Sequence, residues 1–394
     1  MSRPRRRLLW AAAGLLAAAT AWLAFAPVPI APVPWSAPAD AGHSGAHARN
    51  TRLTNLSLLP LGEGHGPEHL VARAGWLYAG LADGSVVRVR ADAPPGTAPQ
   101  PVLQTGGRPL GLDFDAQGRL LIADGVKGLL RATLTDGGAP AQLQPLVTAV
   151  DDPQPGDPVR YADGVLVAPD GTIYFTDASR RFAPAEHTDA PHGGTFHASV
   201  LDTLEHSCTG RLLAHDPQSR YTRVVLRGLC FPNGLALTLD GRHLLLAETG
   251  LYRILKVSTN LQGLSAEQAL QLPGQPVRVL IDKLPGFPDN LTRGEAGRIW
   301  VGLTKPRSKV VDWAASRPWV RELTLRLPQA LWPVPPAYGH VIAFDESGRI
   351  LADLQDPRGA YPETTAVTEA AGRLYVQSLS AAAIGWLDRR AAGL

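Results

Sequence analysis

The chain has 394 residues, of which 45% are hydrophobic and 19% are charged, which allows a large core in one or two domains. The formal net charge of +3 is small and no basic face carries interleaved aromatic residues, so we expect no nucleic-acid partner. The 2 Cys exclude a thiolate metal cluster and a dense disulfide scaffold.

The amino terminus is predicted to be a targeting segment. A basic, cytoplasmic tail (residues 1–7) precedes an apolar run over residues 8–26, and about 20 such residues can cross a bilayer as a helix. The basic tail would place the rest of the chain on the extracytoplasmic, periplasmic side. Ala24-Phe25-Ala26 resembles a signal-peptidase site, but Pro27 follows it. We therefore expect a transmembrane anchor, with a cleaved signal as the alternative.

Residues 27–50 are rich in Pro and Ala and are predicted to be a disordered linker between the anchor and the folded domain. The folded domain then spans residues 51–394.

One pattern recurs along this domain: an apolar strand, a turn with Gly, and a second apolar strand, often followed by a third. The abundance of Gly (40) and Pro (35) suits such β-hairpins. The six copies span residues 68–90, 107–124, 164–177, 235–248, 290–302 and 366–376.

The irregular spacing of these copies favours an all-β, six-bladed β-propeller with loop insertions. No helical periodicity separates the strands, which argues against a parallel α/β sheet. A lone strand over residues 53–61 is predicted to complete the last blade and close the ring.

Four short segments carry a carboxylate or carboxamide at the start of a predicted inner strand. They are Gly66-Pro67-Glu68, Ala162-Asp163-Gly164, Pro232-Asn233-Gly234 and Pro288-Asp289-Asn290. In a closed ring these side chains would meet on the axis, where a set of oxygen donors is typical of a Ca²⁺ site. Because Asp-Gly and Asn-Gly are also common turn pairs, a role as turn residues only is the alternative.

Two insertions break the blade pattern and are predicted to cover one face of the ring. The first, residues 180–207, carries His187, His192, His197 and His206. The second, residues 305–338, carries three Trp and a predicted amphipathic helix around residues 317–331.

Cys208 and Cys230 fall near neighbouring predicted strands of one sheet. In an oxidising compartment they could form a disulfide, and two buried thiols are the alternative, because spacing alone does not decide pairing.

Several segments together resemble the strictosidine synthase-like proteins, over nearly all of the chain after about residue 55. The segments that carry the resemblance are Thr209–Leu213, Gly228–Ala236, Ala247–Thr249, Tyr252–Ile254, Gly107–Gly111, Gly286–Asn290 and Trp300-Val301. The single predicted anchor is similar to that of the adipocyte plasma membrane-associated proteins.

This resemblance implies membership of the calcium-dependent six-bladed propellers, which include gluconolactonases and paraoxonases. In those relatives a central Ca²⁺ is held by residues in motifs that match Glu68, Asp163, Asn233 and Asp289, with Asn290 beside them. The same resemblance implies Asp289 as the general base that activates water, as in the gluconolactonase branch.

Two departures from the family patterns limit the expected chemistry. The catalytic Glu of strictosidine synthase falls on Thr364 or Thr365, beside Glu363, so alkaloid synthesis is not expected. The His that paraoxonases place above the calcium falls on Leu110. His340 or a His of residues 187–206 is a possible substitute, but the favoured interpretation of these histidines is that they are solvated loop residues.

The chemistry that is left is Ca²⁺ acting as a Lewis acid on a small ester, lactone or phosphoryl substrate. The sequence has no Gly-x-Ser-x-Gly motif, which excludes a serine hydrolase of that type. A non-catalytic, membrane-tethered binding propeller is the alternative function.

Overall fold

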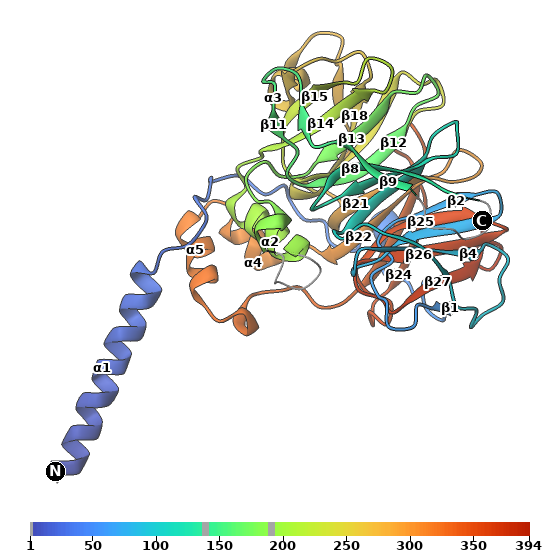
Figure 1. Cartoon of the computed structure of the whole chain (residues 1–394). Helices are drawn as coiled ribbons and strands as arrows, with labels where there is room; N and C mark the ends of the chain where they lie inside the picture. Colours follow the sequence, from blue (N-terminus) through green and yellow to red (C-terminus); the bar gives the residue numbers. More distant parts are fainter. Residues whose placement is uncertain (1–2, 136–141, 188–193) are drawn as a thin grey trace.

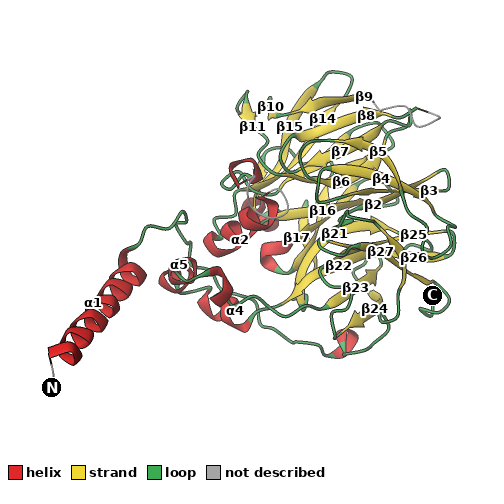
Figure 2. Cartoon of the chain, turned by 60° about the horizontal axis from the view of Figure 1, so that its bottom comes forward, coloured by secondary structure: helices red, strands yellow, loops and turns green. Residues whose placement is uncertain are grey.

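Short antiparallel strands make up most of the chain in the computed structural model, which describes residues 3–135, 142–187 and 194–394. In this part of the chain they form six sheets of four or five strands each, arranged as the blades of a ring (Figures 1 and 2). The predicted six-bladed β-propeller is confirmed.

The blades follow one another in chain order. Blade one has β2 (Leu70–Arg73), β3 (Trp76–Gly80), β4 (Ser85–Arg90) and β5 (Gln100–Gln104). Blade two has β6 (Pro109–Phe114), β7 (Leu120–Asp124), β8 (Gly128–Thr133) and β9 (Gln142–Val147). Blade three has β12 (Ala162–Val167), β13 (Ile173–Asp177), β14 (Gly210–Asp216), β15 (Tyr221–Leu229) and the parallel β19 (Leu264–Ser265).

The second half of the ring repeats this plan. Blade four has β16 (Pro232–Leu237), β17 (His243–Glu248), β18 (Arg253–Ser258) and β20 (Val277–Ile281). Blade five has β21 (Gly286–Arg293), β22 (Ile299–Pro306), β23 (Gly339–Phe344) and β24 (Ile350–Asp356). Blade six has β25 (Thr364–Ala370), β26 (Arg373–Ser378), β27 (Ala383–Asp388) and β1 (Ser57–Pro60). A separate small ladder joins β10 (Ala149–Val150) and β11 (Asp157–Pro158).

The ring is closed by pairing between the first and last strands of the domain. As predicted, β1 from the beginning of the domain pairs antiparallel with β27, so that Leu58 lies opposite Gly385. The inner strands β2, β6, β12, β16, β21 and β25 each contact the next, and β25 contacts β2. Closure of the last blade by an early strand ties the two ends of the domain together.

The core lies between the blades. Each pair of neighbouring blades encloses its own cluster of buried side chains, because both faces of a blade are covered. Between blades four and five, for example, Leu245 and Ile254 pack with Ile299 and Ile342. This explains why the strands read as nearly continuous apolar runs in the sequence.

The helices lie outside the blades. They are α1 (Arg3–Phe25), α2 (Thr195–Glu205), α3 (Ala266–Gln271), α4 (Lys309–Ala314) and α5 (Pro318–Arg326), with 3₁₀ turns η1 (Gly45–His47), η2 (Pro184–His187), η4 (Thr249–Leu251) and η5 (Gln329–Leu331). Figure 1 shows α2, α4 and α5 gathered on one side of the ring, with α1 extending away from them. We call residues 194–207 and 305–338 the cap.

Residues 27–50 form an ordered strap that runs from the cap to blade five, so the prediction of a disordered linker is wrong. The Val33 amide donates to the Glu205 carbonyl oxygen over 2.8 Å, and the Trp35 amide donates to the Ala315 carbonyl oxygen over 3.1 Å. Ile30 is buried in an apolar cluster beneath the cap. The segment is ordered because its extended backbone finds partners and its few apolar side chains find a core.

The predicted transmembrane helix is not supported. Helix α1 occupies that stretch, but among the helices in the described residues none is both long and apolar enough to cross a membrane.

Candidate metal centre

Three of the predicted site residues stand at equivalent places on inner strands, and Glu68 lies two residues before β2. The antiparallel register shifts between Ala162 and Val165 on β12, between Pro232 and Leu235 on β16, and between Pro288 and Leu291 on β21. Asp163, Asn233 and Asp289 occupy these irregularities. A bulge leaves a residue out of the ladder and turns its side chain away from the blade.

Glycines beside these residues allow the inner strands to approach each other closely. A Cβ on Gly164 would lie 2.6 Å from the Asn233 carbonyl oxygen, and one on Gly234 would lie 2.2 Å from the Leu291 amide nitrogen. Both glycines lie inside strands. The alternative that the Asp-Gly and Asn-Gly pairs serve as turns is therefore wrong, and the glycine is required by contact between blades.

The structure brings four of the five predicted residues to one cavity. Glu68, Asp163, Asn233 and Asp289 line a space of about 390 Å³. Asn290 is not among the residues that line it. Its side-chain amide instead donates to Glu68 Oε1 over 3.1 Å and to the Glu68 carbonyl oxygen over 3.2 Å, so Asn290 holds Glu68 in place.

The hydrogen bonds at this site leave particular oxygens without a partner. Asn233 Nδ2 donates to Asp289 Oδ2 over 3.1 Å, which leaves Asn233 Oδ1 free to accept. Within the described residues, Asn233 Oδ1, Glu68 Oε2 and Asp163 Oδ1 are all buried without a protein hydrogen-bond partner. An unpaired buried acceptor is costly, so three of them on one cavity point to a missing electropositive group.

Electrostatics support the same conclusion. Burial, followed by the charges of Asp163 and Asp289, raises the pKa of Glu68 well above its usual range. Burial and the charge of Asp289 raise the pKa of Asp163 in the same way, and burial raises the pKa of Asp289 to about 7. Ionisation of all three carboxyl groups is therefore unfavourable unless a cation shares the site.

Arg108 is a neighbour that the sequence reasoning missed. Its side chain is buried, lines the same cavity, and donates to the Gly66 carbonyl oxygen over 3.2 Å. One guanidinium facing three carboxyl groups leaves two negative charges uncompensated when all are ionised. Arg108 lies within Gly107–Gly111, a segment that carries the family resemblance, and directly before β6. That position was a signal, but a basic side chain does not suggest a cation site.

The donor set fits a hard divalent cation. Carboxylate and amide oxygens with loose geometry suit Ca²⁺, and the orphaned oxygens show where it would be held. Glu68, Asp163, Asn233 and Asp289 would be its protein ligands, and Asn290 would orient one of them.

The positions of catalytic residues in other branches are occupied differently. Leu110 lines the cavity as a buried apolar side chain, where paraoxonases are expected to have His. The Thr365 hydroxyl donates to the Glu68 carbonyl oxygen over 2.5 Å, and Glu363 lies at the cavity wall in an ion pair with Lys305.

The histidines that we considered as substitute bases do not line this cavity in the described structure. His206 stacks on Trp35 with ring centroids 3.9 Å apart, and His187 contacts His197. His340 pairs with Asp353, and His192 lies outside the described residues. A substitute histidine base, the less favoured of the two interpretations of these residues, therefore finds no support.

The cap forms the mouth of the cavity, as predicted for the two insertions. Phe196 and Val200 of α2, together with Trp332 and Val334 that follow η5, line the space opposite the inner strands. Of the three Trp in residues 305–338, only Trp332 takes part. Trp313 and Trp319 are exposed and do not line the cavity.

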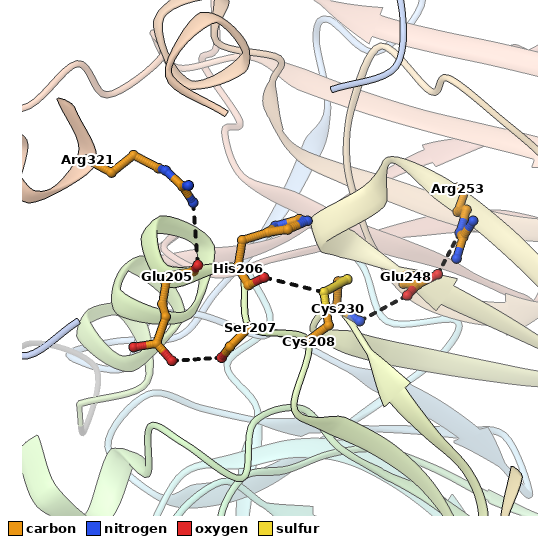
Figure 3. Close-up of a disulfide and its surroundings, with 8 residues drawn as sticks. All are labelled: Glu205, His206, Ser207, Cys208, Cys230, Glu248, Arg253 and Arg321. Atoms are coloured by element: carbon orange, nitrogen blue, oxygen red, sulfur yellow. Dashed lines mark hydrogen bonds and ion pairs between the residues drawn. A yellow bond between two sulfur atoms is a disulfide. The ribbon is translucent and has the colours of Figure 1, made fainter. Parts of the chain in front are cut away.

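A disulfide fixes the cap to the ring. Cys208, just after α2, is bonded to Cys230, just before β16, which settles the alternative left open by the sequence (Figure 3). The Cys230 amide donates to Glu248 Oε1 over 2.9 Å. Since Asn233 lies three residues beyond Cys230, the bond joins the segment after α2 to the segment that leads into a site strand.

Comparison with known proteins identifies the family. A model described as "Strictosidine synthase-like, N-terminal" matches residues 45–89, and one described as "Strictosidine synthase" matches residues 163–261. Protein STRICTOSIDINE SYNTHASE-LIKE 7 of Arabidopsis thaliana is 30% identical over 343 residues, which cover 85% of this chain and 82% of that protein. The chain belongs to the strictosidine synthase-like family.

Other relatives extend the comparison. The adipocyte plasma membrane-associated protein of Homo sapiens is 29% identical over 349 residues, which cover 84% of this chain and 76% of that protein. A solved gluconolactonase from Xanthomonas campestris is similar in fold, with a TM-score of 0.52 and 17% identity over 93% of this chain and 98% of that one. At 17% identity, this structural likeness shows only that the two proteins share the propeller fold.

Proposed function

We propose that this protein is a calcium-dependent hydrolase of small esters or lactones, with its site on the propeller axis. The observation that carries the proposal is the set of buried, unpartnered oxygens on Glu68, Asp163 and Asn233 around one cavity. The likeness of the fold to a gluconolactonase agrees with this class of reaction.

The bound cation and Asp289 would have different roles in the reaction. When bound, Ca²⁺ would polarise the carbonyl oxygen of a substrate and stabilise developing negative charge. Asp289 is the candidate to accept a proton from the attacking water, because its carboxylate lines the cavity beside the other proposed Ca²⁺ ligands. Asn233 and the Asn290 amide hold its two carboxyl oxygens in place over 3.1 and 3.0 Å.

The walls of the cavity favour an apolar acyl or aryl group on the substrate. Leu110, Phe231 and Phe287 approach from the ring, and Phe196 and Trp332 approach from the cap. Such walls exclude water from the reacting carbonyl, and burial of apolar surface against them favours substrate binding.

The test is hydrolysis of phenyl acetate and a panel of lactones by the full chain, with calcium and with a chelator. We expect turnover that the chelator abolishes and that Asp289→Asn reduces by at least about a hundredfold. Asp170→Asn, the same change at an exposed turn, is the control and should be unchanged. Absence of chelator-sensitive turnover on every substrate would overturn the hydrolase.

Leu110 favours a second candidate function, a non-catalytic propeller that binds a small molecule or a partner protein. The apolar Leu110 stands where paraoxonases are expected to have a base. The cavity around it could still hold a small molecule without reacting with it. Calcium-dependent binding of an apolar ester without its hydrolysis, measured by calorimetry, would support this candidate over the enzyme.

Membrane association is a separate part of the proposal. Human and fish relatives carry the name adipocyte plasma membrane-associated protein, and α1 exposes Trp10, Leu15, Leu16, Trp22 and Phe25. We propose that α1 anchors the chain to a membrane, with the propeller on the extracytoplasmic side. Sedimentation of the full chain with phospholipid vesicles, compared with a chain lacking residues 1–26, tests the anchoring.

A further inference from the structure

We propose that His47, His340 and Asp353 form a second metal site, which binds a zinc-like divalent cation and fastens the strap to blade five. His47 Nδ1 lies 2.8 Å from Asp353 Oδ2, and His340 Nε2 lies 2.9 Å from the same oxygen. The three ligand atoms all lie within 4.8 Å of one another.

The separations are compatible with a small cation between the three atoms. Zinc binds His nitrogen and carboxylate oxygen at roughly 2.0–2.2 Å, which places two ligands of a tetrahedral ion roughly 3.3 Å apart. The observed distances are a few tenths of an ångström shorter, so small rotations of both the His47 and the His340 rings would open the required space. His47 belongs to the short turn η1, which can adjust more easily than a strand.

The ligand chemistry separates this site from the one on the axis. Two imidazoles and one carboxylate suit Zn²⁺ and similar transition metals, whereas Ca²⁺ prefers a cage of oxygens. The two sites should therefore select different ions from the same solution.

The carboxylate of Asp353 is held with one oxygen toward the histidines. Its Oδ1 accepts from Asn50 Nδ2 over 3.2 Å and from Gln355 Nε2 over 2.5 Å. Both amides occupy Oδ1, which leaves Oδ2 as the oxygen that faces His47 and His340. Outer contacts of this kind orient the ligands in metal sites of proteins.

The site is enclosed and still reachable from solvent. His340 and Asp353 are buried, while the His47 side chain keeps 19% of its surface exposed. A water molecule can therefore complete the coordination of three protein ligands. The His43 ring packs against His340, with centroids 5.6 Å apart, and closes another side.

The position of the site gives it a structural role. His340 and Asp353 lie on β23 and β24, and His47 lies on the strap about 300 residues earlier in the chain. Around His47 the strap has only the single turn η1 as regular structure. A cation shared by these segments would fasten the strap, and with it the connection to α1, to the propeller.

The test uses the full chain, stripped with chelator and then supplied with excess Ca²⁺ to occupy oxygen sites. Titration with Co²⁺ should produce the visible absorption of a cobalt ion with nitrogen ligands, and Zn²⁺ should displace it at one equivalent. His47→Ala should weaken Zn²⁺ binding by at least about tenfold. His243→Ala, the same change at a half-buried histidine of β17, should leave it unchanged.

His340→Gln is a second variant, and its loss of Co²⁺ absorption would support the same site. Since His47 is partly exposed, His47→Ala is informative even if the buried variant does not fold. Equal Zn²⁺ affinity in the wild type and His47→Ala, or no cobalt absorption in the wild type, would show that the three residues form only a hydrogen-bonded network. Either result would leave calcium-dependent turnover at the axis untouched, so the two proposals fail separately.

Discussion

Asn233 Nδ2 lies 3.1 Å from Asp289 Oδ2, which links the inner strands of blades four and five at the axis of the ring. The contact uses the donor half of the amide and turns its oxygen toward the cavity beside Glu68 and Asp163. One hydrogen bond thus orients both a candidate cation ligand and the candidate base.

Replacing Asn233 with Ala should weaken Ca²⁺ binding by at least about tenfold and remove chelator-sensitive turnover, because it deletes one ligand oxygen and frees Asp289. Isothermal titration calorimetry with Ca²⁺ measures the first effect. Asn260→Ala makes the same chemical change at an exposed position and serves as the control. An unchanged calcium affinity in Asn233→Ala would contradict the assigned ligand set.

Gly234→Ala should destabilise the propeller by about 3 kcal/mol, since the added Cβ would lie 2.2 Å from the Leu291 amide nitrogen and 2.5 Å from the Asn290 Cα. Gly241→Ala is the comparison, because nothing lies within 4 Å of its Cβ and only its φ of +67° opposes the change. We expect that variant to lose about 1 kcal/mol. Urea unfolding measures the free energy of unfolding of both variants. Equal losses of this free energy would argue against close packing at the axis.

The contribution of the acidic cluster to the stability of the calcium-free protein should fall as pH rises from about 4 to about 7. Burial raises the pKa of Asp289 to about 7 in the folded state, against about 3.9 in an unfolded chain. Between these values the folded state binds more protons than the unfolded state, so the free energy of unfolding decreases with pH. The raised pKa values of Glu68 and Asp163 act in the same direction.

Saturating Ca²⁺ should reduce this decrease, because the ion binds the deprotonated carboxylates. Thermal melts across this pH range, with chelator and with Ca²⁺, measure the difference. Superimposable pH profiles under the two conditions would mean that no cation occupies the carboxylate cluster.

Trp35→Ala should loosen the strap and destabilise the protein by about 2 kcal/mol, because the ring is partly buried and stacks on His206. The variant should also be cleaved faster by protease within residues 27–50. Trp319→Ala, at an exposed residue of the cap, should change stability by less than about 0.5 kcal/mol. Equal protease resistance of Trp35→Ala and wild type would show that the strap does not depend on this stack.

Much of the fold and part of the candidate site could be predicted from residue order alone. The apolar strands with Gly turns between them specify six blades, since each strand carries its own local pattern. Residues 53–61 were identified as the closing strand because an early strand without a partner suits an open last blade. Glu68, Asp163, Asn233 and Asp289 were found because each stands at the start of a predicted inner strand.

The remaining features depend on contacts between distant segments. Arg108 joins the acidic cluster, and Asn290 faces Glu68 instead of the cavity, only because neighbouring blades meet at the axis. The strap was predicted to be disordered from its Pro and Ala content, yet Glu205 and Ala315 accept hydrogen bonds from its backbone. Composition describes a segment in isolation and does not include the partners that the cap supplies.

The sequence by itself determined the repeated strands, the family and the oxygen-bearing side chains, because these are properties of short local patterns. Only the tertiary structure decided which oxygens are left without partners, that Cys208 pairs with Cys230, and that His47 meets Asp353. Those outcomes depend on distances between residues far apart in the chain, and closure of the ring sets these distances.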